Sequence, residues 1–378
     1  MSALKLLPRR LPPISPRINR CFSSAPQLED ENLSKFPKRI FSGIQPTGVV
    51  HIGNYLGALQ KWVTLQNSGE DVTYCIVDLH SITLPQDPVA LRQSILKLTA
   101  TLLSIGIDPG KSTLFAQSSV KQHSELNWIL SCLSTMARLS HLPQYKEKTQ
   151  KLKDIPLGLF VYPVLQAADI LVHKATQVPV GEDQVQHIQL AQHLARIFNF
   201  KYGTTFPICH ALIDSDLGGR IKSLRDPTKK MSKSDPDPKS CIYVLDEPDV
   251  ILGKVKKSIT DFTSEVTYEP ETRLGVSNLL QIHSLMSGKT IEQCVEDAKS
   301  IDTGKYKFQV AEAVIEHLNP IRKGALDYLK NPDYLISVLK AGGDKASERA
   351  EETMVEVKEK VGLGAGVGLM PVKLVNEL

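Results

Sequence analysis

The chain has 378 residues, which is long enough for two domains that each bury a hydrophobic core. Apolar residues make up 42% and charged residues 23% of the chain, and no run approaches the roughly 20 apolar residues of a membrane span, which argues against a membrane protein. The six cysteines form no CxxC pair, so we expect neither a cysteine-based metal site nor a disulfide framework.

The net charge of +4 comes from the N-terminus. Residues 1–24 contain five Lys or Arg side chains and no acid, since the first carboxylate is Glu29, and the rest of the chain is near −1 (4 − 5). An acid-free segment with Arg and Ser is typical of a mitochondrial transit peptide, which predicts that residues 1–24 direct the chain to the mitochondrial matrix. A disordered basic arm is the alternative.

Short apolar runs alternate with amphipathic helical patterns from residue 39 to about 215. Asp87 before Pro88 predicts an N-cap with proline at the first helical position. Such alternation predicts an α/β fold with a doubly wound parallel sheet, whose ligands bind at the carboxyl ends of the strands. The predicted strands are 39–45, 73–80 and 113–116, and the predicted helices are 52–66, 88–103, 124–138, 163–172 and 182–198.

A loop rich in Lys, Asp, Pro and Ser at 222–240 interrupts this alternation. We therefore predict an α/β domain over 38–235, a mostly helical domain over 240–361 and a tail over 362–378. Beyond the loop the apolar residues recur with helical spacing, which predicts helices at 276–287, 290–299, 306–318, 320–330, 333–341 and 344–360.

The stretch 41–62, FSGIQPTGVVHIGNYLGALQKW, is rich in glycine and turn-forming residues where the first strand should become a helix. His51 and Asn54 are three residues apart and share one face of that helix. Gly53 between them has no side chain, so a flat ring can lie against the backbone, and the free N–H groups of the helix start favour an anion. The pattern predicts a ligand site, with a purely structural turn as the alternative.

A second motif, KMSKS at 230–234, lies in the loop 222–240. Lys230 and Lys233 flank small hydroxyl residues and suit a mobile clamp on phosphate charge, whereas an isolated pattern of this kind is usually a solvated basic loop. HIGN after the first strand and KMSKS about 180 residues later form a pair that is far more specific than either part.

This pair resembles the HIGH and KMSKS signatures of the class I aminoacyl-tRNA synthetases, which grip ATP. Within that class, SGIQPTG (42–48), HIGNYLGA (51–58), AADIL (167–171) and VPVGEDQ (178–184) resemble the tryptophanyl-tRNA synthetase family, and the likeness runs over about 38–360. It implies a Rossmann-like HUP catalytic domain that attaches L-tryptophan to tRNA(Trp) through tryptophanyl-AMP, using ATP with Mg²⁺ and no tightly bound metal. With its N-terminus, the chain is most similar to the mitochondrial form.

The resemblance also implies a homodimer without a membrane partner, whose helical segment 240–361 reads the anticodon. We place the dimer interface at about 120–160. A helix there carries apolar side chains that core packing would explain equally well, namely Leu126, Trp128, Ile129, Leu130 and Leu133.

Site residues follow from the resemblance only at matching positions. The catalytic positions are Lys230, Lys233, His51 and Asn54. The ATP-binding positions are Gln45, His51, Ile52, Gly53, Asn54, Gly181, Glu182, Asp183, Ile221, Lys230, Met231, Ser232, Lys233 and Ser234, with Lys148 reaching the phosphates from the other side. The tryptophan-binding positions are Asp169, Tyr162, His80, Gln184 and Gln166, and many bacterial relatives have Met in place of Gln166.

The resemblance makes Asp169 the acceptor for the indole N–H of the substrate. Phenylalanine has no ring N–H and would leave a buried Asp169 without its partner, so roughly 10⁴-fold discrimination is expected without editing. An N-cap or a core ion pair is the alternative role for Asp169. The other histidines look unpaired, and we expect ordinary core or surface positions for His123, His141, His193, His210, His283 and His317.

Two other functions stay open. A tyrosyl-tRNA synthetase has the same architecture with a different pocket, although GEDQ and AADIL favour tryptophan. A catalytically silent RNA-binding paralogue would keep the fold, but the intact HIGN, KMSKS and Asp169 argue against it.

Overall fold

The computed structural model describes residues 35–142, 154–213, 221–233 and 235–364. Five strands form one parallel sheet in the order β3-β2-β1-β4-β5, which confirms the predicted doubly wound sheet. The strands are β1 (Ile40–Ile44), β2 (Val72–Ile76), β3 (Thr113–Ala116), β4 (Gln177–Val180) and β5 (His210–Ile213). Because β2 and β4 lie on opposite sides of β1, the strand order reverses there, and ligands of such sheets bind beyond the carboxyl ends of the strands at that point.

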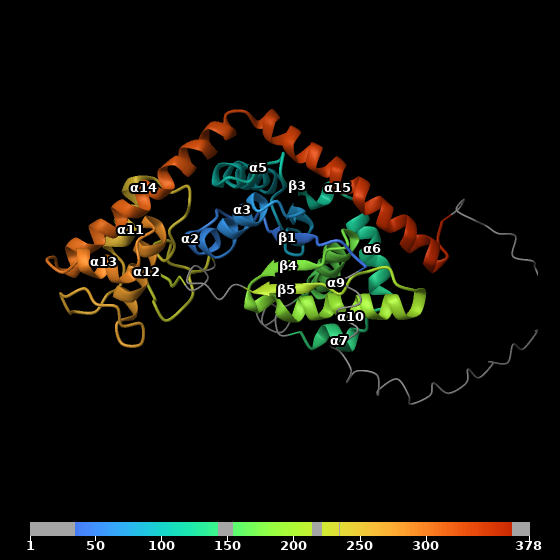
Figure 1. The fold of residues 1–378 in the computed structure, drawn as a ribbon, viewed down its shortest axis with the longest axis horizontal. Helices are drawn as coiled ribbons and strands as arrows, with labels where there is room; N and C mark the ends of the chain where they lie inside the picture. The colour runs from blue at the N-terminus through green and yellow to red at the C-terminus, as the bar shows by residue number, and fades with distance from the viewer. Residues whose placement is uncertain (1–34, 143–153, 214–220, 234, 365–378) are drawn as a thin grey trace, which may run out of the picture.

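Helices flank the sheet (Figure 1). They are α2 (Ile52–Asn54), the π-helical η2 (Tyr55–Leu59), α3 (Gln60–Asn67), α4 (Asp78–Ser81), α5 (Pro88–Ile105), η3 (Gln117–Ser119), α6 (Gln122–Ser131), α7 (Met136–Ser140), α9 (Leu157–Val172), η4 (Glu182–Gln184) and α10 (Val185–Tyr202). Asp87 caps α5 as predicted, because its Oδ1 accepts a hydrogen bond from Ala90 N at 2.7 Å. β2 is shorter than the predicted run 73–80, because Asp78 already belongs to α4 and accepts a hydrogen bond from the backbone of η3 at 2.9 Å.

The C-terminal segment is helical, as predicted, but its last two helices are longer than the sequence suggests. Its helices are α11 (Pro248–Lys256), α12 (Leu274–Ser287), α13 (Ile291–Asp297), α14 (Thr303–Leu329) and α15 (Pro332–Val361). α14 continues through Pro320 and α15 through Gly342, so the predicted interruptions there are wrong. Packing of α14 along α5, α11 and α12 offsets the backbone hydrogen bond that Pro320 cannot donate. Within the described ranges, no helix is long and apolar enough to cross a membrane.

α15 runs from the helical segment back to the sheet (Figure 1). A Cβ atom on Gly342 would lie 1.8 Å from the carbonyl oxygen of Leu114, so the helix backbone touches the edge strand β3. Such cover shields the unpaired backbone groups of an edge strand. Farther along α15, four side chains join the apolar core around β3 and α9, namely Ala346, Ala350, Met354 and Val357. The domain boundary near residue 240 stays a prediction. α15 follows that boundary in the sequence, yet it packs against the α/β domain that precedes it.

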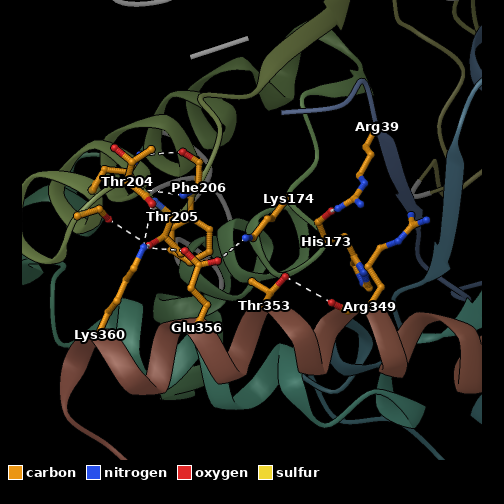
Figure 2. A network of polar contacts seen from close by, with 12 residues as sticks. Arg39, His173, Lys174, Thr204, Thr205, Phe206, Arg349, Thr353, Glu356 and Lys360 are labelled. Carbon is orange, nitrogen blue, oxygen red and sulfur yellow. Dashed lines mark hydrogen bonds and ion pairs between the residues drawn. The ribbon is translucent and has the colours of Figure 1, made fainter. Parts of the chain in front are cut away.

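Polar contacts fasten the end of α15 to segments that lead into β4 and β5 (Figure 2). Glu356 pairs with Lys174 at 2.5 Å and with Lys360 at 2.6 Å. Lys360 also donates to Thr204 O at 2.8 Å and to Thr205 Oγ1 at 2.7 Å. Lys174 lies between α9 and β4, and the two threonines lie between α10 and β5. The same helix thus contacts the approaches to two neighbouring strands.

Candidate active site

The HIGN segment follows the carboxyl end of β1 and starts a helix. His51 is the N-cap of α2, and its Nδ1 accepts a hydrogen bond from Asn54 N at 3.3 Å. A Cβ atom on Gly53 would lie 3.0 Å from two atoms of the His51 imidazole, so the flat ring next to this glycine is that of His51 itself. The carboxamide oxygen of Asn54 is buried and has no hydrogen-bond partner in the described part of the chain, which leaves it open to a ligand donor.

The KMSKS segment lies against the HIGN segment. The ammonium of Lys233 donates to Thr47 O at 2.9 Å, and Met231 Cβ lies 3.8 Å from the position of a Cβ atom on Gly53. Met231 N donates in turn to Ile221 O at 3.0 Å, which brings another predicted ATP-binding residue to the same place. The structure therefore brings together the two motifs that the sequence separates.

Positive charge surrounds His51. Burial, followed by the charges of Lys233 and Lys230, lowers the pKa of His51 from 6.5 to about 4. The imidazole is therefore neutral at pH 7, with one donor and one acceptor nitrogen. Burial also lowers the pKa of Lys233. Lysine charge held in such a partly buried position concentrates positive potential where the phosphates of a nucleotide can lie.

A second group of polar residues surrounds Asp169, which lies in α9 and is 1% exposed. Three side chains donate hydrogen bonds to its carboxylate. His80 Nε2 donates to Oδ2 at 2.8 Å, while His123 Nδ1 and Gln117 Nε2 both donate to Oδ1 at 2.6 Å. Burial acts to raise the pKa of Asp169, but the hydrogen bonds from His123 and His80 outweigh it, and the pKa falls below its usual range. The group is a carboxylate enclosed by donors.

Two predictions about this cluster are wrong. His123 has the core position that was expected, but it is not unpaired, because its Nδ1 donates to Asp169 and its Nε2 lies 3.1 Å from Nε2 of His173. Asp169 does not lack partners when no ligand is bound, and its pairing with His80 and His123 corresponds to the alternative of a core ion pair. Gln117 was missed although it directly follows β3, at the carboxyl edge where ligands of parallel sheets bind. Its position was the one sequence signal available.

A third cluster lies at η4, directly after β4, around Gln184. The Oε1 atom of Gln184 accepts from Gln166 Nε2 at 3.3 Å and from His187 Nδ1 at 3.0 Å. Its Nε2 donates to Asp183 Oδ2 at 2.6 Å. The other ring nitrogen of His187 accepts from the Tyr162 hydroxyl at 3.4 Å. His187 thus links Tyr162 to Gln184, two predicted tryptophan-binding residues, and Gln184 continues the contacts to the predicted ATP-binding residue Asp183. The sequence analysis assigned no role to His187.

The rings of His80 and Tyr162 join the Asp169 cluster to the η4 cluster. Their centroids are 6.2 Å apart and their planes nearly perpendicular, at 80°. All five predicted tryptophan-binding positions therefore lie in one connected set of contacts. The set is Asp169, His80, Tyr162, Gln184 and Gln166.

The remaining predicted positions lie at strand ends or outside the described residues. Gln45 follows β1, Gly181 and Glu182 follow β4, and all three are exposed at the carboxyl ends of adjacent strands. Ser234 and Lys148 lie outside the described residues. Within the described ranges, no group of three or more His, Cys, Asp or Glu side chains is placed to hold a metal ion.

Comparison with known proteins places the chain in a family. The model of the class I tRNA synthetases (W and Y) matches residues 34–319. The chain belongs to this family. Among its curated relatives, the tryptophan--tRNA ligase of Caldanaerobacter subterraneus subsp. tengcongensis is 46% identical over 326 residues, which are 86% of this chain and 98% of the relative. The tryptophan--tRNA ligase of Wolinella succinogenes is 47% identical over 327 residues, which are 86% and 99%.

Solved structures of the family agree with this fold. Tryptophanyl-tRNA synthetase from Mycoplasma pneumoniae has a TM-score of 0.78 at 31% identity and covers 87% of this chain and 99% of its own. The enzyme from Campylobacter jejuni, complexed with ADP and tryptophan, has a TM-score of 0.76 at 32% identity and covers 86% and 100%. The chain is therefore an aminoacyl-tRNA synthetase with the Rossmann-like catalytic fold of class I, and curated relatives at 43–47% identity support the activity of a tryptophan--tRNA ligase.

Proposed function

We propose that the chain attaches L-tryptophan to tRNA(Trp) in two steps, for protein synthesis in mitochondria. The observation that carries the reaction is the contact of Lys233 with Thr47, which sets the KMSKS lysines beside the HIGN segment. Gly48 supports this approach, because its φ of +70° favours glycine and a Cβ atom there would lie 3.7 Å from Lys233 Cδ. Relatives named as tryptophan--tRNA ligases supply the identity of the amino acid.

In the first step, a carboxylate oxygen of tryptophan attacks the α-phosphorus of ATP. A carboxylate–phosphorus bond forms, the bond to the β-phosphate breaks, and pyrophosphate leaves. The carboxylate is ionised near pH 7, so the protein needs no general base. It has to hold the reactants in line and stabilise the charge that moves onto pyrophosphate. Lys230 and Lys233 supply the positive charge that stabilises it, and Mg²⁺ enters with ATP as part of the substrate.

In the second step, a hydroxyl of the terminal adenosine ribose of tRNA attacks the acyl carbon of tryptophanyl-AMP. An ester bond forms, the bond between the acyl carbon and the phosphate oxygen breaks, and AMP leaves with the bonding electrons. The proton of the hydroxyl passes to the AMP phosphate or to water. Before and during these steps Asp169 accepts the indole N–H, beside His80, whose ring meets that of Tyr162. The helical segment 240–361 reads the anticodon in this proposal.

The test is ATP–pyrophosphate exchange with each of the twenty amino acids. We expect exchange with tryptophan, and we expect Lys233→Ala to lower its rate by roughly 10²-fold or more, because a group that stabilises transition-state charge is lost. Lys239→Ala is the matched control, since Lys239 is exposed in the same loop and should change the rate by less than about threefold. Thermal denaturation of both variants shows whether the fold is kept.

Each alternative function has its own outcome in this assay. Exchange that depends on tyrosine alone identifies a tyrosyl-tRNA synthetase. Tight binding of tRNA without exchange identifies a silent RNA-binding paralogue. An unchanged rate in Lys233→Ala removes the clamp role from the KMSKS lysines.

We also propose a homodimer that uses the region 120–160. The chain's own core buries Leu126, Ile129 and Leu130, so these three do not support an interface. Trp128 on α6 is 70% exposed and Met136 on α7 is 77% exposed, and both helices pack against α9. Exposed large apolar side chains on neighbouring helices favour a protein–protein contact.

Light scattering tests the dimer. Trp128→Glu should convert a dimer into a monomer, because a carboxylate would be buried in the interface. Phe200→Glu is the control, since Phe200 is a similarly exposed aromatic side chain on α10 and its change should leave the mass unaltered. A wild-type monomer, or a Trp128→Glu dimer, contradicts the proposal.

We further propose import into the mitochondrial matrix. Residues 1–24 lie outside the described residues, and their five basic side chains without any acid support this location. A reporter protein fused to residues 1–24 should be imported by isolated mitochondria and shortened. Replacing the arginines of this segment by glutamate should abolish import, and a reporter that stays outside in both forms favours a disordered basic arm.

A further inference from the structure

We propose that His123 is a positioning residue that controls selectivity for a ring N–H. Together with Gln117 it occupies one oxygen of Asp169, so that the carboxylate offers only its other oxygen to the substrate. The inference rests on the proposed function, in which Asp169 accepts the indole N–H. It assigns a role to a histidine that does not touch the substrate in that proposal.

The acceptor sites of Asp169 can be counted. A carboxylate has two oxygens and about four acceptor positions. Oδ1 accepts from His123 Nδ1 and Gln117 Nε2, both at 2.6 Å, and is fully used. Oδ2 accepts from His80 Nε2 at 2.8 Å and keeps one position. A substrate N–H therefore has a single acceptor position to bind, and it lies on Oδ2.

The open position is on the oxygen of Asp169 that His80 contacts. Gln117 and His123, on the Oδ1 side, are both 0% exposed, whereas His80 and its neighbour Tyr162 are 6% and 7% exposed. The amide of Gln117 has a fixed orientation, because its Oε1 accepts from Leu79 N at 3.1 Å and its Nε2 must therefore face Asp169. The closed side of the carboxylate is thus held by two donors that cannot turn toward solvent.

His173 contacts His123 on the ring nitrogen that does not bind Asp169. The Nε2 atoms of the two rings are 3.1 Å apart, so one proton lies between them. His173 is 2% exposed and stacks on Phe41, with ring centroids 5.5 Å apart and planes 15° apart. Phe115 meets both histidine rings at 5.7 Å between centroids. The imidazole of His123 consequently has no room to swing away from Asp169.

Without the His123 donor, one acceptor position on Oδ1 becomes empty. The carboxylate can then rotate or take a water molecule, and the substrate N–H no longer meets a preset oxygen. The loss should appear in the binding of tryptophan and in the preference for a ring N–H, while ATP binding at the HIGN segment is unaffected. A merely structural role for His123 would lower stability and leave that preference unchanged.

The experiment compares tryptophan with 3-(1-benzothiophen-3-yl)-L-alanine, in which sulfur replaces the ring N–H. The measured quantity is the ratio of their kcat/KM values in ATP–pyrophosphate exchange by the full chain. We expect roughly 10- to 150-fold preference for tryptophan in the wild type, the worth of one hydrogen bond to a charged group. His123→Leu should reduce this ratio at least threefold and raise KM for tryptophan, with KM for ATP within about twofold of the wild type.

Two amide variants distinguish the loss of the Nδ1 donor from a change in the packing of the side chain. His123→Asn places its amide N–H near the former Nδ1 and should keep the ratio within about twofold of the wild type. His123→Gln reaches toward His173 instead and should behave like His123→Leu. This pair carries the test even if the leucine variant does not fold.

The outcomes distinguish the inference from the function on which it rests. A wild-type enzyme that uses tryptophan, together with an unchanged ratio in His123→Leu and His123→Gln, overturns the role of His123 alone. Equal losses in the asparagine and glutamine variants also overturn it. No tryptophan-dependent exchange in the wild type overturns the proposed function and this inference with it.

Discussion

Alanine at Gly342 should destabilise the protein, although alanine normally favours helices. In an exposed helix interior, Gly→Ala stabilises by roughly 0.5–1 kcal/mol. At Gly342 the new Cβ atom would lie 1.8 Å from Leu114 O, and because ordinary contact begins near 3.4 Å, α15 would have to withdraw from β3 by about 1.6 Å (3.4 − 1.8). Overpacking a core costs about 1–3 kcal/mol, and a strand carbonyl cannot rotate away as a side chain can. We expect the free energy of unfolding to fall by about 3 kcal/mol.

Gly253→Ala is the matched control for this prediction. Gly253 lies inside α11, and a Cβ atom there meets no atom within 4 Å. This variant should gain roughly 0.5–1 kcal/mol. Urea denaturation followed by circular dichroism measures both changes from the midpoint and slope of the transition. If Gly342→Ala is as stable as the wild type, α15 does not lie against the edge of the sheet as described.

Two further predictions concern the site. Asp169→Ala should lower the free energy of unfolding by roughly 3–5 kcal/mol, because three buried donors lose their acceptor. Asp169→Asn keeps an oxygen for two of these donors and should cost less. Equal losses for the two variants in urea denaturation would contradict the hydrogen bonds. The folded pKa of His51, about 4, lies below the usual 6.5, so the unfolded chain takes up its proton first as pH falls. The free energy of unfolding should therefore drop by about 2 kcal/mol between pH 6.5 and pH 5 on account of His51. His51→Asn still caps α2 but cannot take up this proton, so it should lack the His51 share of the drop. Denaturation of both proteins at pH 7 and pH 5 measures the difference.

Local signals predicted the elements whose causes are local. The cap at Asp87 and the alternation of apolar runs placed α5 and three of the five strands, because each depends on residues a few positions apart. The breaks expected at Pro320 and Gly342 were wrong for one physical reason. Both residues usually end helices, but here tertiary packing keeps them inside a continuous helix. Gly342 is needed because β3 approaches the helix backbone, and that contact joins residues far apart in the sequence.

The candidate site shows the same division. The HIGN and KMSKS motifs could be paired from the sequence because each has a recognisable pattern, and the structure brings them together through Lys233 and Thr47. No pattern marks His123 or Gln117, whose partner Asp169 lies 46 and 52 residues away. Hydrogen-bond partners at such separations are set by how α6 and η3 pack against α9, and this packing cannot be derived from local spacing.

The three donors on Asp169 change the expected origin of selectivity. A carboxylate whose sole partner is the substrate N–H would reject an analogue without that group by roughly 10⁴-fold or more. Asp169 keeps three hydrogen bonds when the substrate N–H is missing, so the analogue forfeits one charged hydrogen bond of about 1.5–3 kcal/mol, or roughly 10- to 150-fold. Discrimination against phenylalanine beyond that factor must come from the shape of the pocket. His80, which donates to the open oxygen, and Tyr162, whose ring meets that of His80 nearly at right angles, are the side chains placed to provide it.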